Sequence, residues 1–175
     1  SLILKSNTVQ PAVSQSRLFN YNNGQITDDL HFGTAALTPA YAWVSLDDDG
    51  TFANTERIFG VGSAVTSTAY NMNVVHDSST DGTRIYAKLD GVYKVTNLAT
   101  LQGGFGNATM KVKVDGSEVF SQLKFIHSSV DPVDRNTIYV GSVSSGSFIT
   151  ATVIGDGSDL TSYEAGSVLL VERLS

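Results

Sequence analysis

Hydrophobic and polar residues alternate along this chain in short runs, and almost no segment has the spacing of an amphipathic helix. Val, Ile, Thr, Tyr and Phe fill the runs, while Gly, Asp, Asn and Ser separate them at fairly even intervals. Short strands divided by regularly spaced turn residues are typical of a β-sandwich or barrel. The pattern therefore predicts an all-β protein of antiparallel strands.

The strands are clearest in the C-terminal half, beginning with residues 85–89 and 92–101. In the second run, alternate residues from Tyr93 to Leu101 share one face, because side chains alternate across a strand. Residues 110–114 alternate Met and Val with Lys, which indicates a half-exposed strand. These segments give the clearest strand signals in the chain.

Two hairpins are predicted next. Asp115-Gly116 follows residues 110–114 and precedes a run from Glu118 to Ile126. Asp-Gly between two strand-like runs is a strong hairpin signal, because a type I′ turn needs positive φ at both central residues. The second predicted hairpin joins residues 136–143 to residues 148–154.

The chain ends on residues 167–174, which contain four successive apolar residues. A continuous apolar run predicts a strand that is buried on both faces. Such a strand needs more cover than one sandwich supplies, so we expect the chain to form a homotrimer through the face that contains this run: Val168, Leu169, Leu170 and Val171.

The N-terminal half is less regular, with predicted strands at residues 41–46, 57–61 and 70–76. Residues 1–40 have mixed polarity, and Asn20 to Gly24 is a loop signal. We therefore expect an extended N-terminal arm over residues 1–40 and a β-sandwich domain over residues 41–175, which the resemblance described below implies to be a jelly roll.

Apolar residues recur along the arm without enough continuous pattern for a core of their own. Ordering such a segment costs about 1–2 kcal/mol per residue, so we expect it to order only against a partner, by strand-like pairing and by filling small apolar pockets. The candidate anchors are Leu2, Leu4, Val9, Leu18 and Phe19.

Aromatic residues gather at the junction of the arm and the domain, where Tyr41, Trp43 and Phe52 lie close in sequence. Large aromatic side chains concentrate at interface hot spots, so Trp43 is a candidate anchor for a neighbouring protein. The alternative, that Trp43 is a core residue, stays open.

Composition narrows the class of partner. The charged fraction is 16 %, below the roughly 25 % of average soluble domains, which fits a surface that meets other proteins. The net charge of −6 and the scattered basic residues argue against binding to nucleic acid or to an anionic membrane. There is no cysteine, no apolar run long enough to cross a bilayer and no signal-peptide pattern, so we expect assembly in a cytoplasm.

From Arg84 onward the chain resembles the C1q/TNF-like jelly roll found in phage head and tail accessory proteins. Three motifs carry the resemblance: residues 89–95 (LDGVYKV), residues 111–116 (KVKVDG) and residues 166–174 (GSVLLVERL). The resemblance implies a sandwich of ten or fewer strands that assembles as a trimer, with the last strand near the threefold axis. Phage versions of the fold decorate capsids, form short head fibres or cap tail fibres.

Candidate metal ligands are few. Asp47-Asp48-Asp49-Gly50 suggests a calcium loop, but three contiguous aspartates lack the alternate spacing of an EF-hand, so we expect a solvated turn. The three histidines, His31, His76 and His127, have no paired spacing. On a threefold axis, one histidine from each subunit could still supply three ligands. We expect no metal and no other cofactor.

No catalytic motif is present either. The chain has no Gly-x-Ser-x-Gly elbow, and its glycine-rich stretches at residues 60–63 and 103–106 lack the lysine of phosphate-binding loops. A pair of glycosidase carboxylates cannot be located from the sequence. We expect that the protein is not an enzyme.

These observations favour a structural virion protein of a bacteriophage. The first hypothesis is a trimeric capsid decoration, cement or head-fibre protein, anchored by its arm to the major capsid protein or to other virion proteins. The alternative is the receptor-binding tip of a tail fibre, recognising a host glycan or protein. A hydrolase on the particle is a third hypothesis that no motif supports. The expected location is the virion, assembled in the host cytoplasm.

Overall fold

The computed structural model describes the backbone of residues 20–22, 25–28, 38–51, 56–103, 106–126, 133–155, 160–163 and 165–175. The chain separates into two units, residues 1–38 and residues 39–175. In the first unit, β1 (Asn20–Asn22) pairs with β2 (Gln25–Asp28) in antiparallel fashion. The loop expected from Asn20 is therefore wrong for residues 20–22, which form a strand.

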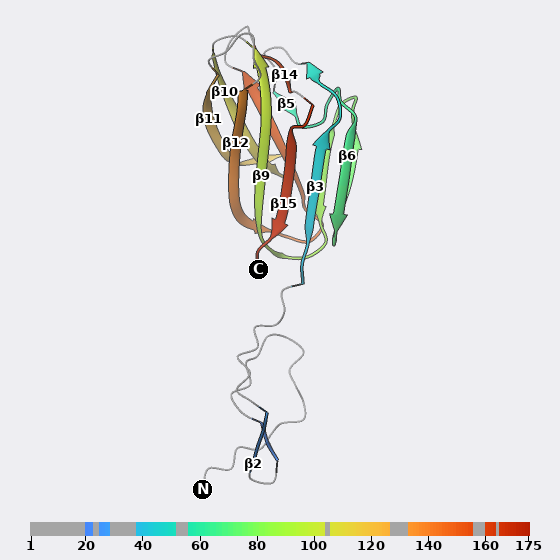
Figure 1. Cartoon of the computed structure of the whole chain (residues 1–175), viewed down its shortest axis with the longest axis vertical. Coiled ribbons are helices and arrows are strands. Elements are labelled where there is room, and N and C mark those ends of the chain that lie inside the picture. The colour runs from blue at the N-terminus through green and yellow to red at the C-terminus, as the bar shows by residue number, and fades with distance from the viewer. Residues whose placement is uncertain are drawn as a thin grey trace. The chain divides into compact units, whose positions relative to one another are not determined.

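The second unit contains two antiparallel sheets, of which the larger has seven strands (Figure 1). Its central strand β9 pairs with β12 on one side and with β14 and β15 on the other, while β15 continues to β3 and β6, and β14 to β4. The strands are β3 (Tyr41–Leu46), β4 (Gly50–Thr51), β6 (Val65–Tyr70), β9 (Gly91–Gly103), β12 (Val133–Val143), β14 (Leu160–Tyr163) and β15 (Val168–Arg173).

The second sheet has six strands in the order β11-β10-β13-β8-β7, with β5 also paired to β13. In Figure 1 this sheet lies behind the seven-stranded sheet, so that the unit is a two-layered sandwich. The strands are β5 (Arg57–Ile58), β7 (Met72–Asp77), β8 (Gly82–Ala87), β10 (Gly106–Val114), β11 (Ser117–Ile126) and β13 (Phe148–Gly155).

The core lies between the two sheets and is filled by alternate residues of their strands. In β3 the exposed and buried residues follow one another, and β10 shows the same period of two. The largest fully buried side chains include Tyr93, Phe59 and Ile85. The predicted all-β antiparallel jelly-roll sandwich is confirmed, and none of the described residues is helical.

Of the two predicted hairpins, the one at Asp115-Gly116 is confirmed. The one between residues 136–143 and 148–154 is wrong, because β12 and β13 belong to different sheets. Asp115 has φ 51° and Gly116 has φ 80°, the two positive values that a type I′ turn requires. The Asp115 carboxylate also accepts a hydrogen bond of 2.9 Å from the backbone N–H of Phe148, so the turn is attached to β13 as well.

Two predictions about N-terminal strands are wrong in part. Residues 70–76 were expected as one strand, but the chain bends at Asn71, with φ 52°, and passes from β6 in one sheet to β7 in the other. Residues 57–61 were expected as a strand, but only Arg57 and Ile58 pair with β13, and the chain then turns. Local propensity does not reveal where a chain changes sheets.

The terminal strand is present but is not equally buried on both faces. Leu169 and Val171 are fully buried in the core, whereas Val168 and Leu170 lie on the opposite face and are only half-buried. The expectation of burial on both faces is therefore wrong within one chain, because the described residues leave Val168 and Leu170 partly exposed on the outer side of this sheet.

Candidate assembly face

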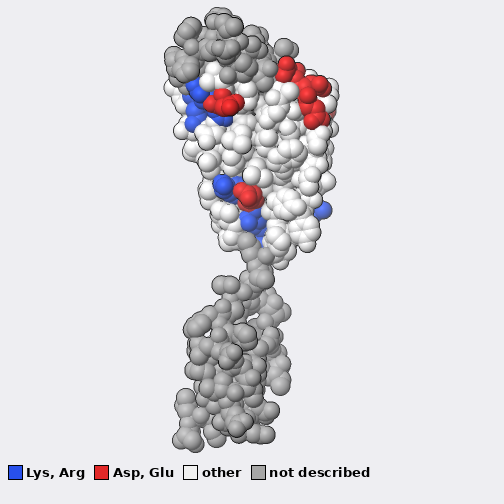
Figure 2. Space-filling view, viewed as in Figure 1, with Lys and Arg blue, Asp and Glu red and all other residues white. Residues whose placement is uncertain are grey.

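The outer face of the seven-stranded sheet exposes several large hydrophobic side chains to solvent. Six of the ten exposed large hydrophobic side chains of the described residues lie on it. Figure 2 shows this face with few charged residues, which gather at its ends and margins. We name it the apolar face and define it by Tyr41, Trp43, Tyr70, Leu98, Ile138 and Val140, together with half-buried Val168 and Leu170.

The face has an aromatic patch on one side, formed by Tyr41 and Trp43 of β3 and Tyr70 of β6. The rings of Tyr41 and Tyr70 stack with their centroids 6.2 Å apart. Trp43 is 37 % exposed and Tyr70 is 51 % exposed. The alternation of β3 directs these side chains outward, because Ala42 and Val44 between them are completely buried.

On the other side of the face, the edge strand β12 carries an aliphatic ridge. Ile138 and Val140 point outward and are about half exposed, at 47 % and 54 %. Thr137 and Tyr139 alternate with them and point toward the core, where Thr137 is 1 % exposed. The strand therefore turns Ile138 and Val140 toward solvent, while Val143 lies in the core.

The pairing register places the ridge and the patch at matching levels of the sheet. One row across the strands begins with Val140, which lies opposite Lys94. The same row then passes through Glu172 to Tyr41 and Tyr70. The next row runs from Ile138 through Thr96 and Leu170 to Trp43. Between the two sides, Lys94 and Glu172 form a partly exposed ion pair of 3.4 Å.

The six-stranded sheet also exposes Val75, Val119 and Leu123, but its outer face differs in carrying a network of ion pairs. There the Glu56 carboxylate lies 2.9 Å from the Lys113 ammonium and 3.7 Å from that of Lys111, and Lys111 also pairs with Glu118 at 3.1 Å. The Thr152 hydroxyl donates a hydrogen bond of 2.6 Å to Glu56. A face with its own network of ion pairs is already suited to solvent.

These contacts lower the pKa of Glu56. Burial by itself would raise the pKa, but the hydrogen bond from Thr152 and the hydrogen bond and charge of Lys113, helped by the charge of Lys111, outweigh it. The charged form of the carboxylate is therefore the one that this face stabilises.

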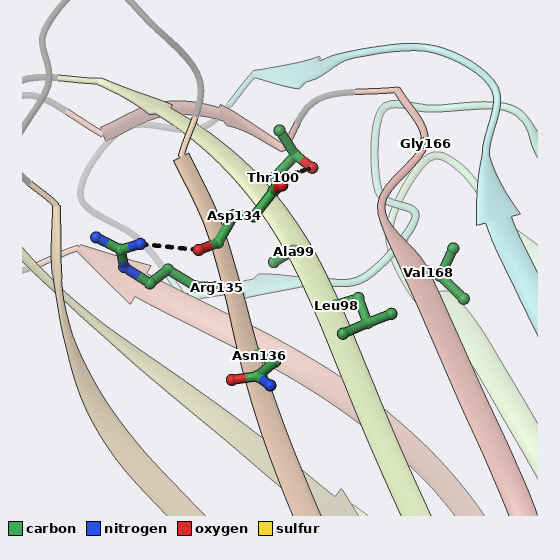
Figure 3. A pocket seen from close by; sticks show the side chains of 8 residues that line it. All are labelled: Leu98, Ala99, Thr100, Asp134, Arg135, Asn136, Gly166 and Val168. Atoms are coloured by element: carbon green, nitrogen blue, oxygen red, sulfur yellow. Dashed lines mark hydrogen bonds between the residues drawn. The ribbon is translucent and has the colours of Figure 1, made fainter.

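A hollow of about 450 Å³ opens at one end of the apolar face, between β9, β12 and β15 (Figure 3). The Thr100 hydroxyl donates a hydrogen bond of 2.7 Å to the Asp134 carboxylate, and the Arg135 guanidinium donates one of 2.8 Å to the Asp134 carbonyl. The lining residues are Leu98, Ala99, Thr100, Asp134, Arg135, Asn136, Gly166 and Val168.

The interface residues predicted from the sequence divide into three groups. Trp43, Val168 and Leu170 lie on the apolar face. Leu169 and Val171 lie in the core, so they cannot contact a neighbour directly. The arm residues lie outside the described part of the chain, so their role stays a prediction: Leu2, Leu4, Val9, Leu18 and Phe19.

Sequence reasoning missed Tyr70, Leu98, Ile138 and Val140. The sequence signal for the ridge is the alternation within β12, but an apolar residue in a strand is normally assigned to the core. Only the core position of Thr137 shows that Ile138 and Val140 point outward.

The candidate metal ligands have other contacts. Asp47 accepts a hydrogen bond from the Thr66 hydroxyl, and Asp49 accepts one from the Ala165 N–H. The His76 ring lies between the Thr83 hydroxyl, at 3.2 Å, and the Ser63 carbonyl, at 3.0 Å. Within the described residues, no three His, Asp or Glu side chains are grouped to hold a metal ion. The same residues contain no helix that could span a membrane. His31 and His127 lie outside those residues.

The chain is similar to known proteins in its fold but not in its sequence. No family model matches the sequence, and no curated protein matches it. Among solved structures, crystal structures of murine APRIL at pH 5.0 and pH 8.0 superpose with TM-scores of 0.55 and 0.52, both at 11 % identity, over 78 % of this chain and 100 % of theirs. The Eiger TNF structure from S. frugiperda superposes with a TM-score of 0.50 at 10 % identity, over 78 % of this chain and 94 % of that chain. At these identities the likeness shows the fold alone, which is a TNF-like jelly roll.

Proposed function

We propose that this chain is a structural, non-catalytic protein that assembles as a homotrimer through the apolar face. The observation that carries the proposal is the contrast between the two outer faces. Monomeric proteins rarely expose a large contiguous apolar patch, and such patches mark interaction sites. The polar face of the six-stranded sheet carries its own ion pairs, so the apolar face is the one that needs a partner.

The arrangement of the face favours a head-to-tail contact between copies. The ridge and the patch lie on opposite sides of the face but in the same two register rows. Rotation about an axis that runs along the strands keeps each row at its level, so Val140 of one copy meets the aromatic patch of the next. A repeated head-to-tail contact closes into a ring when the rotation fits. The resemblance to trimeric jelly rolls supports a ring of three.

The biological setting is proposed from the sequence motifs. Their resemblance to phage accessory proteins supports a role as a capsid decoration, cement or head-fibre protein of a bacteriophage, with the major capsid protein or another virion protein as second partner. A tail-fibre tip that recognises a host glycan or protein is the second candidate. Quantitative mass spectrometry of purified particles distinguishes them, since decoration needs hundreds of copies and a tail tip far fewer.

Assembly is tested by replacing Val140 with Asp. The wild-type protein is expected to have the mass of three chains in light scattering at micromolar concentration. The new carboxylate would be buried in the contact without a partner, at a cost of about 3 kcal/mol or more, so the variant is expected to be monomeric. Leu123→Asp is the matched control, because Leu123 is 61 % exposed on the other sheet and lies outside the apolar face. A monomeric wild-type protein would overturn the proposal.

Cysteine cross-linking tests the head-to-tail contact, and the chain has no natural cysteine to interfere. The variant with both Tyr70→Cys and Val140→Cys is expected to yield covalent trimers on oxidation, while either single variant stays uncross-linked. Covalent dimers alone at full oxidation would show a two-fold contact in place of a ring. Absence of any cross-link in a trimeric protein would show that the trimer uses another face.

A further inference from the structure

The hollow at the end of the apolar face arises from a break in the strands beside β9. β14 ends at Tyr163, opposite Leu101, and β15 begins at Val168, opposite Leu98. Thr100 lies in the gap, where the Ser167 hydroxyl accepts a hydrogen bond of 3.0 Å from its N–H and lies 3.5 Å from its carbonyl. The gap is thus stabilised by a side chain instead of a strand.

Among the described residues, Gly166 leaves part of this gap open. Gly166, at the start of the turn into β15, contributes no side chain, and a Cβ atom placed there would meet nothing within 4 Å. The volume of about 450 Å³ is within the range of pockets that bind small molecules.

The walls of the hollow differ in chemistry. Leu98, which is 44 % exposed, and Val168 form an apolar side. The opposite side carries the Thr100 hydroxyl, the Asp134 carboxylate and the Asn136 carboxamide (Figure 3). The hydrogen bond from Thr100 orients the carboxylate, while Asn136 offers both donors and an acceptor.

We propose that this hollow binds a neutral sugar residue. A pyranose presents an apolar C–H face, which suits Leu98 and Val168, and adjacent hydroxyl groups, which suit the carboxylate of Asp134 and the carboxamide of Asn136. Asp134 and Arg135 carry opposite charges, and the Arg135 guanidinium donates a hydrogen bond to the Asp134 backbone carbonyl.

The hollow shares Leu98 and Val168 with the end of the apolar face. Asn136 and Leu98 lie in one register row with Val168, and Asp134 and Thr100 lie one row further toward the end of the sheet. The proposed ring contact is centred on the rows of Val140 and Ile138, so Asp134 and Thr100 lie two rows, about 14 Å, beyond Ile138.

Saturation-transfer NMR on the full chain tests the proposal, with D-mannose, D-galactose, L-fucose and N-acetylglucosamine as probes. Binding of at least one neutral sugar is expected in the millimolar range, as for small ligands in shallow sites. The affinity is expected to fall at least tenfold in Asp134→Asn and in Asn136→Ala. Asp48→Asn is the matched control, an exposed aspartate outside the hollow, and is expected to bind as the wild type does.

Sialic acid and arginine are the charged probes of the same experiment. Binding of arginine without any neutral sugar would overturn the proposal, because the site would then select a cation. No binding by any probe would overturn it as well. Light scattering on the same samples keeps the outcome separate from assembly, since a trimer that binds no sugar refutes only this site.

Discussion

Glu56 shows how single residues keep one sheet face polar. Its carboxylate lies between Lys111 and Lys113 and accepts a hydrogen bond from Thr152. These contacts outweigh the burial that would raise the pKa, and they hold the pKa of Glu56 below its ordinary value. A depressed carboxylate pKa adds stability above the pKa of the unfolded chain, and this stability is lost as the pH falls through the folded-state value.

Glu56→Gln is therefore expected to lower the free energy of unfolding by about 1 kcal/mol at pH 7. The difference from wild type should shrink as the pH falls below the unfolded-state pKa, about 4.3, and through the lower folded-state pKa. Urea unfolding at pH 7 and at pH 3 measures both values. An equal difference at the two pH values would show that the charge of Glu56 does not contribute.

Gly60 occupies a position that has no room for a side chain, because the backbone there lies against the ring of His76. Its φ is +89°, and an added Cβ would meet the Thr83 hydroxyl oxygen at 2.5 Å and the His76 ring at 3.0 Å. Gly146 has nearly the same φ, +88°, with nothing within 4 Å of an added Cβ. Alanine at Gly146 would therefore show the cost of backbone strain alone, and alanine at Gly60 would show the same strain together with steric contact.

Gly146→Ala is expected to cost about 1–2 kcal/mol, the strain of a left-handed alanine. Gly60→Ala is expected to cost a further 1–3 kcal/mol or so, because Thr83 and His76 must shift. Urea midpoints of the two variants measure the difference. Equal midpoints would mean that the neighbours of Gly60 move aside without cost.

At the scale of elements, the β10–β11 hairpin combines a local signal with a tertiary contact. The Asp-Gly pair supplies two positive φ angles, and Asp115 also bonds to Phe148 in β13. Asp115→Ala is expected to lower the free energy of unfolding by about 1–2 kcal/mol, because alanine tolerates positive φ poorly and Phe148 loses its acceptor. Asp115→Asn keeps both features and should cost less than half as much. Thermal unfolding of both variants tests this, and equal losses would contradict it.

The strand β12 shows where pattern reading fails at this scale. Its alternation is visible in the sequence, but Thr137 faces the core and Ile138 faces solvent, the reverse of the usual assignment. Register decides the orientation, because Ile138 lies opposite Thr96 on the outer side of β9. Neighbouring strands set which face of a strand is buried.

At the scale of the whole molecule, the sandwich is expected to fold without its N-terminal arm. Every buried hydrophobic residue of the described core, from Ala40 to Val171, belongs to the second unit. Deleting residues 1–35 should therefore leave a folded protein. Under the proposed virion role, this protein should still form a trimer but should no longer bind phage particles. Circular dichroism and light scattering test the fold and the assembly, and co-sedimentation with particles tests the binding. An unfolded truncated protein would place the arm in the core of the domain, and full binding would refute its anchoring role.

Strand content, the Asp115-Gly116 hairpin and the sandwich class follow from local chemistry, because alternation and turn residues act over a few neighbouring positions. Three features could be identified only from the tertiary structure. They are the crossing between sheets at Asn71, the outward ridge of Ile138 and Val140, and the hollow beside Thr100. Each depends on which distant strands become neighbours. Periodicity says that a strand has two faces, but only packing decides which face is covered and which is left for a partner.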